Sequence, residues 1–302
     1  MLKHPNLELD EVGLGATGAT APAALSQPAD RPITEIRPHR GALDLDLAAI
    51  WRHRELLHFL VLREIKIRYK QAALGVAWTV IQPVFAALIF TVVFGIFARF
   101  PSDGVPYALF ALSAIIPWTY FAEALRRAST GLVEDAELIR KIYFPRLVLP
   151  LAAIISPLLD LAVAFAVFAV LMAWYRLAPN YHLVLLPVFI AMSACASLAF
   201  ALWLGPLNVR YRDIKQVLPF LLQVWMYASP IVYPITLVPE RWRLLYSLNP
   251  MVAIIQGFRW ALLGAAPPSA AAMVLTVTST VVLLLGGLVY FRRSERSFAD
   301  VI

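Results

Sequence analysis

The sequence predicts an all-α integral membrane protein with six transmembrane helices, and two observations carry that prediction. Of its 302 residues, 61% are apolar, and the mean hydropathy of +0.73 is well above that of ordinary globular proteins. Only 15% of the residues are charged, and these gather in a few blocks between long apolar runs. A helix of about 20 apolar residues is long enough to cross a bilayer core of about 30 Å.

Six apolar runs define the predicted spans. The first run carries Pro83, the third carries a single charge, Asp160, and the fifth is interrupted by Pro219, Pro230 and Pro234. The predicted spans are residues 74–98, 106–123, 147–175, 183–208, 216–236 and 269–291. Together with the loops between them, they form a membrane domain over residues 73–292.

The segments before the first span have a different composition. Residues 1–48 are rich in Ala, Pro and Gly and lack the apolar core of a signal peptide, so we predict a mostly disordered cytoplasmic tail. Residues 49–72 are predicted to form an amphipathic helix at the cytoplasmic membrane surface. Its basic side places four cations within about 60° of one another, where they meet lipid phosphates. These are Arg52, Arg63, Lys66 and Lys70. The alternative is a cytoplasmic helix that only precedes a span.

A shorter segment lies between spans five and six. Residues 244–258 are too few to cross a bilayer, and Asn249-Pro250 interrupts them. We therefore predict a pair of short re-entrant or interfacial helices, with a surface loop as the alternative.

The distribution of basic residues sets the expected orientation. With the N-terminus in the cytoplasm, 21 of the 26 Lys and Arg residues fall on the cytoplasmic side and 5 on the opposite side. This asymmetry follows the positive-inside rule and puts both ends, including residues 293–302, in the cytoplasm. The net charge of +7 is thereby assigned to lipid headgroups instead of nucleic acid.

Several chemistries find little support in the sequence. The single cysteine, Cys195, lies in an apolar run and forms no disulfide within the chain, and the five histidines show no metal-ligand spacing. Asp160 is the one acid at membrane depth; it is either a proton site or a partner for a neighbouring helix. The chain has no G-x-x-x-x-G-K-[ST] loop to hold ATP phosphates, so any driven work needs a partner.

The longest cytoplasmic loop, residues 123–150, offers a site for such a partner. Ser129 or Thr130 is predicted to cap a short helix whose acids come early and whose cations come late, in the order that suits the helix dipole. Apolar side chains on this helix would enter a cleft on a soluble subunit. They are Leu138, Ile139, Ile142 and Phe144. The alternative is an ordinary amphipathic connector.

Four segments resemble the type-2 ABC permease family, most closely its polysaccharide-export (Wzm-like) and teichoic-acid-export branch. In chain order they read LREIKIRYKQAALGVAWTVIQP (62–83), ELIRKIYFPRLVLP (137–150), LNVRYRDIKQVLPFLLQVWMYASPIVYP (207–234) and SLNPM (247–251). The resemblance covers roughly residues 50–292. The long N-terminal tail departs from the family, and the chain carries no C-terminal carbohydrate-binding module, which in this family sits on the ATPase chain where it occurs.

The resemblance implies the membrane subunit of an ATP-driven exporter of a lipid-linked polysaccharide, such as O-antigen, in the inner membrane. It implies a homodimer of this chain with two copies of a separate ATPase, which binds ATP and magnesium, and no cofactor or catalytic residue on this chain. The helix before the first span would be a gate at the cytoplasmic entrance, with its four cations near the substrate headgroup. The loop after span two would couple to the ATPase through Glu134, Glu137, Leu138, Ile139, Arg140, Lys141 and Phe144.

Aromatic residues are candidates for the wall of a glycan channel, because aromatic rings stack on sugar faces. The candidates are Tyr120, Phe121, Phe220, Trp225, Tyr227 and Tyr233. The alternative for each is core packing or a membrane-interface belt.

Other functions stay open at this point. Within the same class, the cargo is a capsule or teichoic-acid polymer, a drug or a small lipid. A membrane-embedded glycosyltransferase would need a metal-binding acidic cluster, for which Glu134, Asp135 and Glu137 are the candidates. A passive channel or structural protein is the third reading.

Overall fold

The computed structural model describes residues 47–70, 75–211 and 213–301, which contain helices and connecting segments and no strand. The predicted tail therefore falls almost entirely outside the described residues. The first helices are α1 (Leu47–Arg52), α2 (Arg54–Lys70), α3 (Gly75–Phe90), the π-helix η1 (Thr91–Phe97), α4 (Tyr107–Glu134), α5 (Ala136–Lys141), α6 (Val148–Ile155) and α7 (Leu158–Trp174). They are followed by η2 (Tyr181–Leu185), α8 (Leu186–Arg210), α9 (Ile214–Tyr227), η3 (Ile235–Leu237), α10 (Glu240–Tyr246), α11 (Pro250–Leu263) and α12 (Ala270–Val301).

Five helical segments of the described chain are long and apolar enough to cross a membrane. They are Ala77–Phe97, Tyr107–Glu134, Val148–Trp174, Tyr181–Arg210 and Ala270–Glu295. The all-α membrane class is thus confirmed, and the chain is a multi-pass membrane protein.

The count of six spans is not confirmed, because the predicted span over residues 216–236 is not one helix. Helix α9 ends at Tyr227 after 14 residues, or about 21 Å, and turns and the short helix η3 follow. The cause lies in Pro230 and Pro234, which lack a backbone N–H and disfavour helix in the residue before them.

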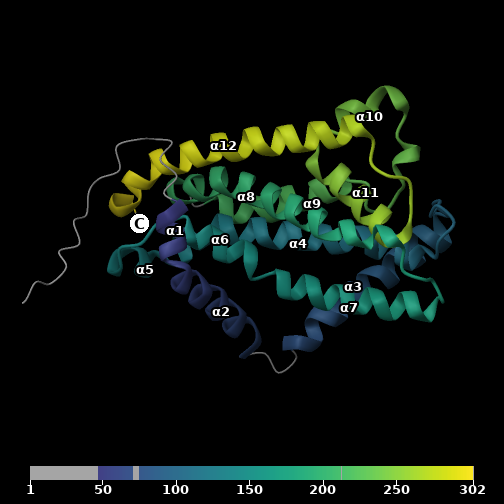
Figure 1. Cartoon of the computed structure of the whole chain (residues 1–302), viewed down its shortest axis with the longest axis horizontal. Coiled ribbons are helices and arrows are strands. Elements are labelled where there is room, and N and C mark those ends of the chain that lie inside the picture. Colours follow the sequence, from purple (N-terminus) through teal and green to yellow (C-terminus); the bar gives the residue numbers. More distant parts are fainter. Residues whose placement is uncertain (1–46, 71–74, 212, 302) are drawn as a thin grey trace, which may run out of the picture. The chain divides into compact units, whose positions relative to one another are not determined.

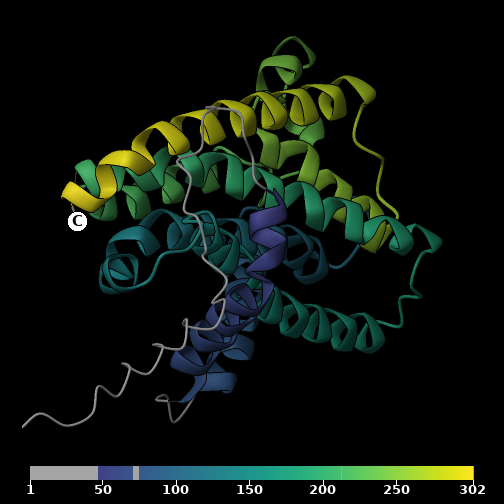
Figure 2. The same ribbon diagram turned by 60° about the vertical axis from the view of Figure 1, so that its left-hand side comes forward.

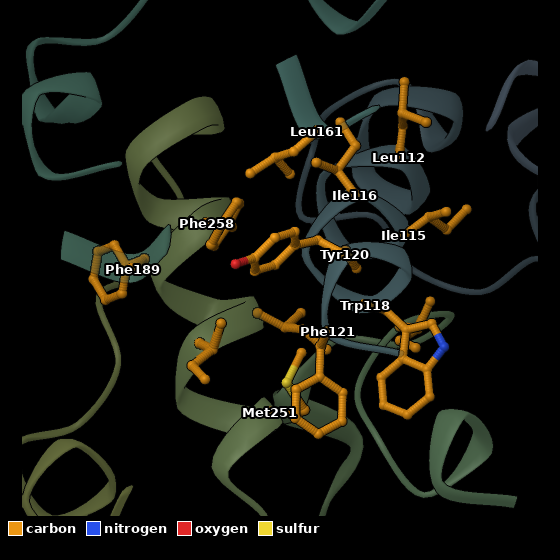
Figure 3. Close-up of a cluster of buried hydrophobic side chains, with 14 of the residues drawn as sticks. Leu112, Ile115, Ile116, Trp118, Tyr120, Phe121, Leu161, Phe189, Met251 and Phe258 are labelled. Carbon is orange, nitrogen blue, oxygen red and sulfur yellow. The ribbon is translucent and has the colours of Figure 1, made fainter. Parts of the chain in front are cut away.

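Helix α4 lies at the centre of the described bundle (Figure 1) and packs against α3, α6, α7, α8, α9 and α11. Of its most apolar stretch, 78% is buried by other helices. A helix that is apolar on all sides is stable only when it is surrounded in this way. Figure 3 shows the core that results, in which Tyr120 and Phe121 of α4 lie near Phe258 and Met251 of α11.

A second apolar cluster joins elements from both ends of the chain. It contains Leu60 of α2, Phe144 before α6, and Phe291 and Phe298 of α12. Helix α12 also lies along α8, as Figures 1 and 2 show, where the rings of Trp203 and Tyr290 stack at 5.1 Å. The second cluster brings α2 and the segment after α5 onto a common apolar base.

The predicted pair of short helices between the last two spans is present as α10 and α11 (Figure 1). Asn249 separates them and caps α11, because its side chain accepts a hydrogen bond from the amide of Met251 at 3.0 Å. The same side chain accepts from the Trp225 indole at 2.9 Å and donates to Ser229 at 2.9 Å. Helix α11 ends at Gly264, whose φ of 70° is the left-handed conformation that glycine adopts readily.

The predicted interface helix is two helices, α1 and α2, separated at His53. The side of α2 that packs on the bundle is apolar in its first half, around Leu60. In its second half the same helix carries half-buried Glu64 and Arg68, which differs from the predicted division into one apolar and one basic side. Charged groups tolerate such burial only when they are paired, and both of these are.

Candidate functional site

The candidate docking site is the segment from the end of α4 to the start of α6. Helix α4 continues through Ser129 and Thr130, both of which are buried, so neither residue caps a helix as predicted. The short helix α5 begins instead after Asp135. It contains the predicted acid-to-base order, with Glu137 in its first turn and Arg140 and Lys141 in its last, which suits the helix dipole.

The predicted docking residues divide into exposed and buried groups. Glu134, Glu137, Arg140 and Lys141 are exposed. The apolar members do not project as a group: Leu138 and Ile139 are half-buried against the second cluster, and Phe144 lies inside it with 5% of its surface exposed. These three side chains hold the segment in place on the protein's own core.

Of the four predicted apolar residues only Ile142 is exposed, and its neighbour Tyr143 is exposed beside it. Ile142 is 50% exposed, and Tyr143, which was not among the predicted site residues, is 74% exposed. For Tyr143 the sequence offered a weak signal, since it follows the cations Arg140 and Lys141 closely in the sequence. An exposed tyrosine beside charged residues is a common composition at protein interfaces.

The acidic cluster of this segment does not converge on one point. The three ion pairs are Glu134 with Lys215 at 3.6 Å, Asp135 with Arg63 at 2.5 Å and Glu137 with Lys141 at 2.9 Å. Among the described residues, no group of three or more His, Cys, Asp or Glu side chains is arranged to hold a metal ion. The arrangement is that of a charged helix surface and gives no support to a metal-dependent transferase site.

Helix α2 is held to the bundle by a set of contacts that we name the α2 ion-pair cluster. Its members are Arg63, Glu64, Arg68 and Tyr69 of α2, Glu123 and Arg127 of α4, Asp135 directly after α4, Ser156 after α6, and Asp160 in the first turn of α7. The sequence analysis anticipated only that Asp160 could be a partner for a neighbouring helix. The contacts between α2 and the other helices were not predicted, because they join residues far apart in the sequence.

Asp160 is the acid of the α2 ion-pair cluster that lies on α7. Its carboxylate forms an ion pair with Arg68 and accepts a hydrogen bond from the Tyr69 hydroxyl. Of the two readings of this residue, the structure therefore favours a partner for a neighbouring helix. Burial lowers the pKa of Arg68, and the positive charge of Arg127 acts in the same direction.

The middle of the cluster is centred on two glutamates. Glu64 accepts a hydrogen bond from the Ser156 hydroxyl at 2.6 Å and lies 3.9 Å from the Arg127 guanidinium. Glu123 accepts from Arg127 at 2.5 Å and lies 4.0 Å from Arg68. Because each acid faces a cation or a hydroxyl from another element, the charges compensate one another although they are partly buried.

The four cations predicted for the entrance are separated by these contacts. Arg63 forms an ion pair with Asp135 and is not available as a free charge. Arg52, at the end of α1, is exposed, as are Lys66 and Lys70 on α2. The structure thus brings the two lysines to one exposed stretch of α2 and assigns Arg63 to a contact within the protein.

The predicted channel aromatics also divide into two groups. Tyr120 and Phe121 are buried in the core (Figure 3), and Trp225 packs edge-on against Phe121 at 5.1 Å. Phe220 and Tyr227 are exposed on α9. Tyr233 shares a hydrogen bond of 2.8 Å between its hydroxyl and that of Tyr246, and it is half-buried.

Arg259 is a residue that the sequence analysis missed. It is 3% exposed within apolar α11, and its guanidinium donates to the carbonyls of Ile231 at 2.8 Å and Tyr233 at 3.3 Å. It also lies 3.7 Å from the centre of the Phe110 ring. A lone arginine within an apolar segment was the available signal. It attaches the non-helical segment after α9 to α11 and α4.

These features define the class of the protein: a multi-pass helical membrane domain with an exposed charged helix at one end of α4. The sequence matches the ABC-2 type transporter family over residues 55–263, more than half of the chain, and the chain belongs to that family. The match begins on α2 and ends with α11, so it includes both the α2 ion-pair cluster and α5.

Several curated relatives align with most of this chain. It is 28% identical to the O-antigen export system permease protein RfbA of Myxococcus xanthus, over 70% of this chain and 81% of that protein. It is 25% identical to the RfbA protein of Klebsiella pneumoniae, over 68% and 79%. It is 26% identical to the polysialic acid transport protein KpsM of Escherichia coli, over 68% and 80%.

Proposed function

We propose that this chain is the permease subunit of an ATP-driven exporter that moves a lipid-linked polysaccharide, such as O-antigen, across the cytoplasmic membrane. The observation that carries the proposal is the alignment with export permeases over about four-fifths of their own length. The family match over residues 55–263 includes α5, the α2 ion-pair cluster and the helices up to α11, so the similarity is not confined to one motif.

A separate ATPase subunit would supply the energy, bind ATP and magnesium, and dock on α5. Support comes from the exposure of Glu137, Arg140, Lys141 and Tyr143 on one short segment. Mixed charges around an exposed aromatic anchor favour a specific protein contact. The positive-inside distribution of Lys and Arg supports a cytoplasmic location for this segment and for both termini.

A homodimer would form the translocation path. Helix α9 exposes an apolar stripe at helical spacing, consisting of Val217, Phe220, Leu221, Val224 and Tyr227. The two aromatic residues of this stripe are the predicted channel residues that stay accessible. In a dimer they would offer ring faces to sugars, whereas Tyr120, Phe121 and Trp225 would support the helices from within.

The exposed cations of α1 and α2 would meet the pyrophosphate of the lipid carrier. Arg52, Lys66 and Lys70 are placed for this role, since all three are exposed. Phosphate groups at a membrane surface attract such cations at about 1 kcal/mol per residue.

Deletion of the gene in its native host tests the proposal. We expect loss of surface polysaccharide, accumulation of lipid-linked polymer in the cytoplasm, and the same phenotype on deletion of the cognate ATPase gene. Normal surface polysaccharide in the deletion strain would refute the proposal.

A second cargo, a capsular polysaccharide, is supported by the similarity to the polysialic acid transport protein. The accumulated polymer decides between the two. Loss of lipopolysaccharide bands with an intact capsule would identify O-antigen, and the reverse would identify a capsular polymer.

A further inference from the structure

Asp135 joins α4 to α5, and its side chain contacts a third helix. Its carbonyl accepts hydrogen bonds from the amides of Leu138 at 3.0 Å and Ile139 at 3.1 Å, which begin α5. Its carboxylate does not cap α5, although aspartate is a favoured capping residue. Instead it accepts a hydrogen bond from Arg63 of α2 at 2.5 Å. The junction between α4 and α5 is therefore attached directly to α2.

Helices α2 and α5 also share an apolar base. Leu60, one turn before Arg63, is 1% exposed in the second cluster. Leu138 and Ile139 of α5 pack against the same cluster. Because closely packed side chains transmit displacement, a shift of α5 reaches the first half of α2 through this cluster as well as through the ion pair.

The other end of α2 is attached to a membrane-crossing segment. Arg68 and Tyr69 contact Asp160 of α7. Arg68 lies five positions after Arg63, which corresponds to about 7.5 Å along the helix. Asp160 lies in the first turn of α7, just after the break in the helix at Ser156. Helix α7 is therefore separate from α6 and is not its continuation. A continuous series of contacts thus runs from α5 through α2 to α7.

We propose that the Arg63–Asp135 ion pair passes movement of α5 on to α2, and that α2 passes it to α7 at Asp160. Arg63 is then a positioning residue, in contrast to the headgroup contact that its sequence position suggested. This inference rests on the proposed function, because the movement would start when ATPase subunits bound to α5 close on ATP. It specifies how hydrolysis on another chain reaches α2 and α7.

Charge reversal in the complete permease–ATPase complex tests the inference. The variants are Arg63→Glu, Asp135→Arg and the two combined. All are made in a Cys195→Ser background, so that an environment-sensitive fluorophore attaches only to Phe59→Cys, an exposed position of α2. Two quantities are measured in inside-out vesicles: the ATP-dependent fluorescence change, and the polymer translocated per ATP hydrolysed. Lys215→Glu is the matched control, since it breaks the exposed pair with Glu134 and does not contact α2.

We expect each single reversal to lower both quantities by about fivefold, the lower end of typical coupling between sites. The combined reversal should restore both, and Lys215→Glu should leave both unchanged. A merely stabilising pair would instead lower the amount of assembled complex and leave the polymer translocated per ATP hydrolysed unchanged in the complexes that assemble. Where a reversal prevents assembly, Arg63→Gln and Asp135→Asn replace it. Unchanged single variants, or a combined variant that assembles without restoring transfer, would overturn the inference. If the unmodified complex translocates no polymer, the proposed function fails instead.

Discussion

The contact of Asp160 with α2 makes a specific prediction for Asp160→Asn. The substitution removes the negative charge that faces Arg68 and keeps an oxygen that accepts the Tyr69 hydrogen bond. Arg68 would keep only Glu123, at 4.0 Å, as a nearby acid. The side chains of Arg68 and Asp160 are 18% and 24% exposed to solvent, so this pair is neither fully buried nor a surface pair.

The exposure sets the expected magnitude. Exposed ion pairs contribute about 0–1 kcal/mol, and removal of one partner of a buried pair costs about 3–5 kcal/mol. A pair that is mostly buried but still reaches solvent falls between these limits, at about 2 kcal/mol. Since 1.4 kcal/mol corresponds to a factor of ten, the second half of α2 should detach from α7 about 30 times more often.

Hydrogen–deuterium exchange in lipid nanodiscs measures this detachment. Amides of residues 64–70 should exchange about 30-fold faster in Asp160→Asn, with little change in α4, because exchange reports local opening. Asp213→Asn, which alters an exposed carboxylate outside the cluster, is the control. Exchange in the double variant Arg68→Gln/Asp160→Asn should be little faster than in Asp160→Asn alone, because both substitutions remove the same ion pair. Equal exchange in all of these proteins would refute the pairing.

Three further predictions concern other positions. A Cβ at Gly257 would lie 2.1 Å from the buried Phe189 ring, so Gly257→Ala should cost about 1–3 kcal/mol of stability. This cost should lower the midpoint of thermal unfolding. Gly131→Ala is the control, because a Cβ at Gly131 meets open space and should leave the midpoint unchanged. Arg259→Leu should leave two carbonyls without their donor and cost about 2 kcal/mol, which proteolysis of the segment after α9 would detect. Tyr143→Asp should weaken ATPase co-purification about tenfold with an unchanged unfolding midpoint; full recovery of the complex would remove this residue from the interface.

The all-α membrane fold was predictable because a bilayer imposes a simple requirement. Every spanning helix must be apolar over about 20 residues, and this shows in composition alone. The failure over residues 216–236 is instructive, because hydropathy does not distinguish a straight helix from a shorter one followed by turns. Pro230 and Pro234 were visible in the sequence, but the sequence did not show that Arg259 would satisfy the carbonyls of Ile231 and Tyr233.

The site was predictable only where it depends on local order. The acid-to-base order of α5 and the interruption at Asn249-Pro250 follow from neighbours in sequence, but α5 begins after Asp135 and not at the predicted cap, Ser129 or Thr130. Which apolar residues face outward depends on the second cluster, which joins segments from opposite ends of the chain. Phe144 therefore looked like a docking residue and is core, whereas Tyr143 is exposed.

The two halves of α2 are attached by different forces, and this difference suits a helix that moves at one end. Burial of a leucine such as Leu60 contributes about 1.5–3 kcal/mol and has no substitute partner once water enters. The half-buried ion pair is of similar magnitude, about 2 kcal/mol, but water hydrates both charges once they separate. The first half should therefore stay on the second cluster while the second half, held by Arg68 and Tyr69 at Asp160, exchanges between attached and detached positions. A purely apolar α2 would be fixed along its whole length, and a purely charged one would have no pivot.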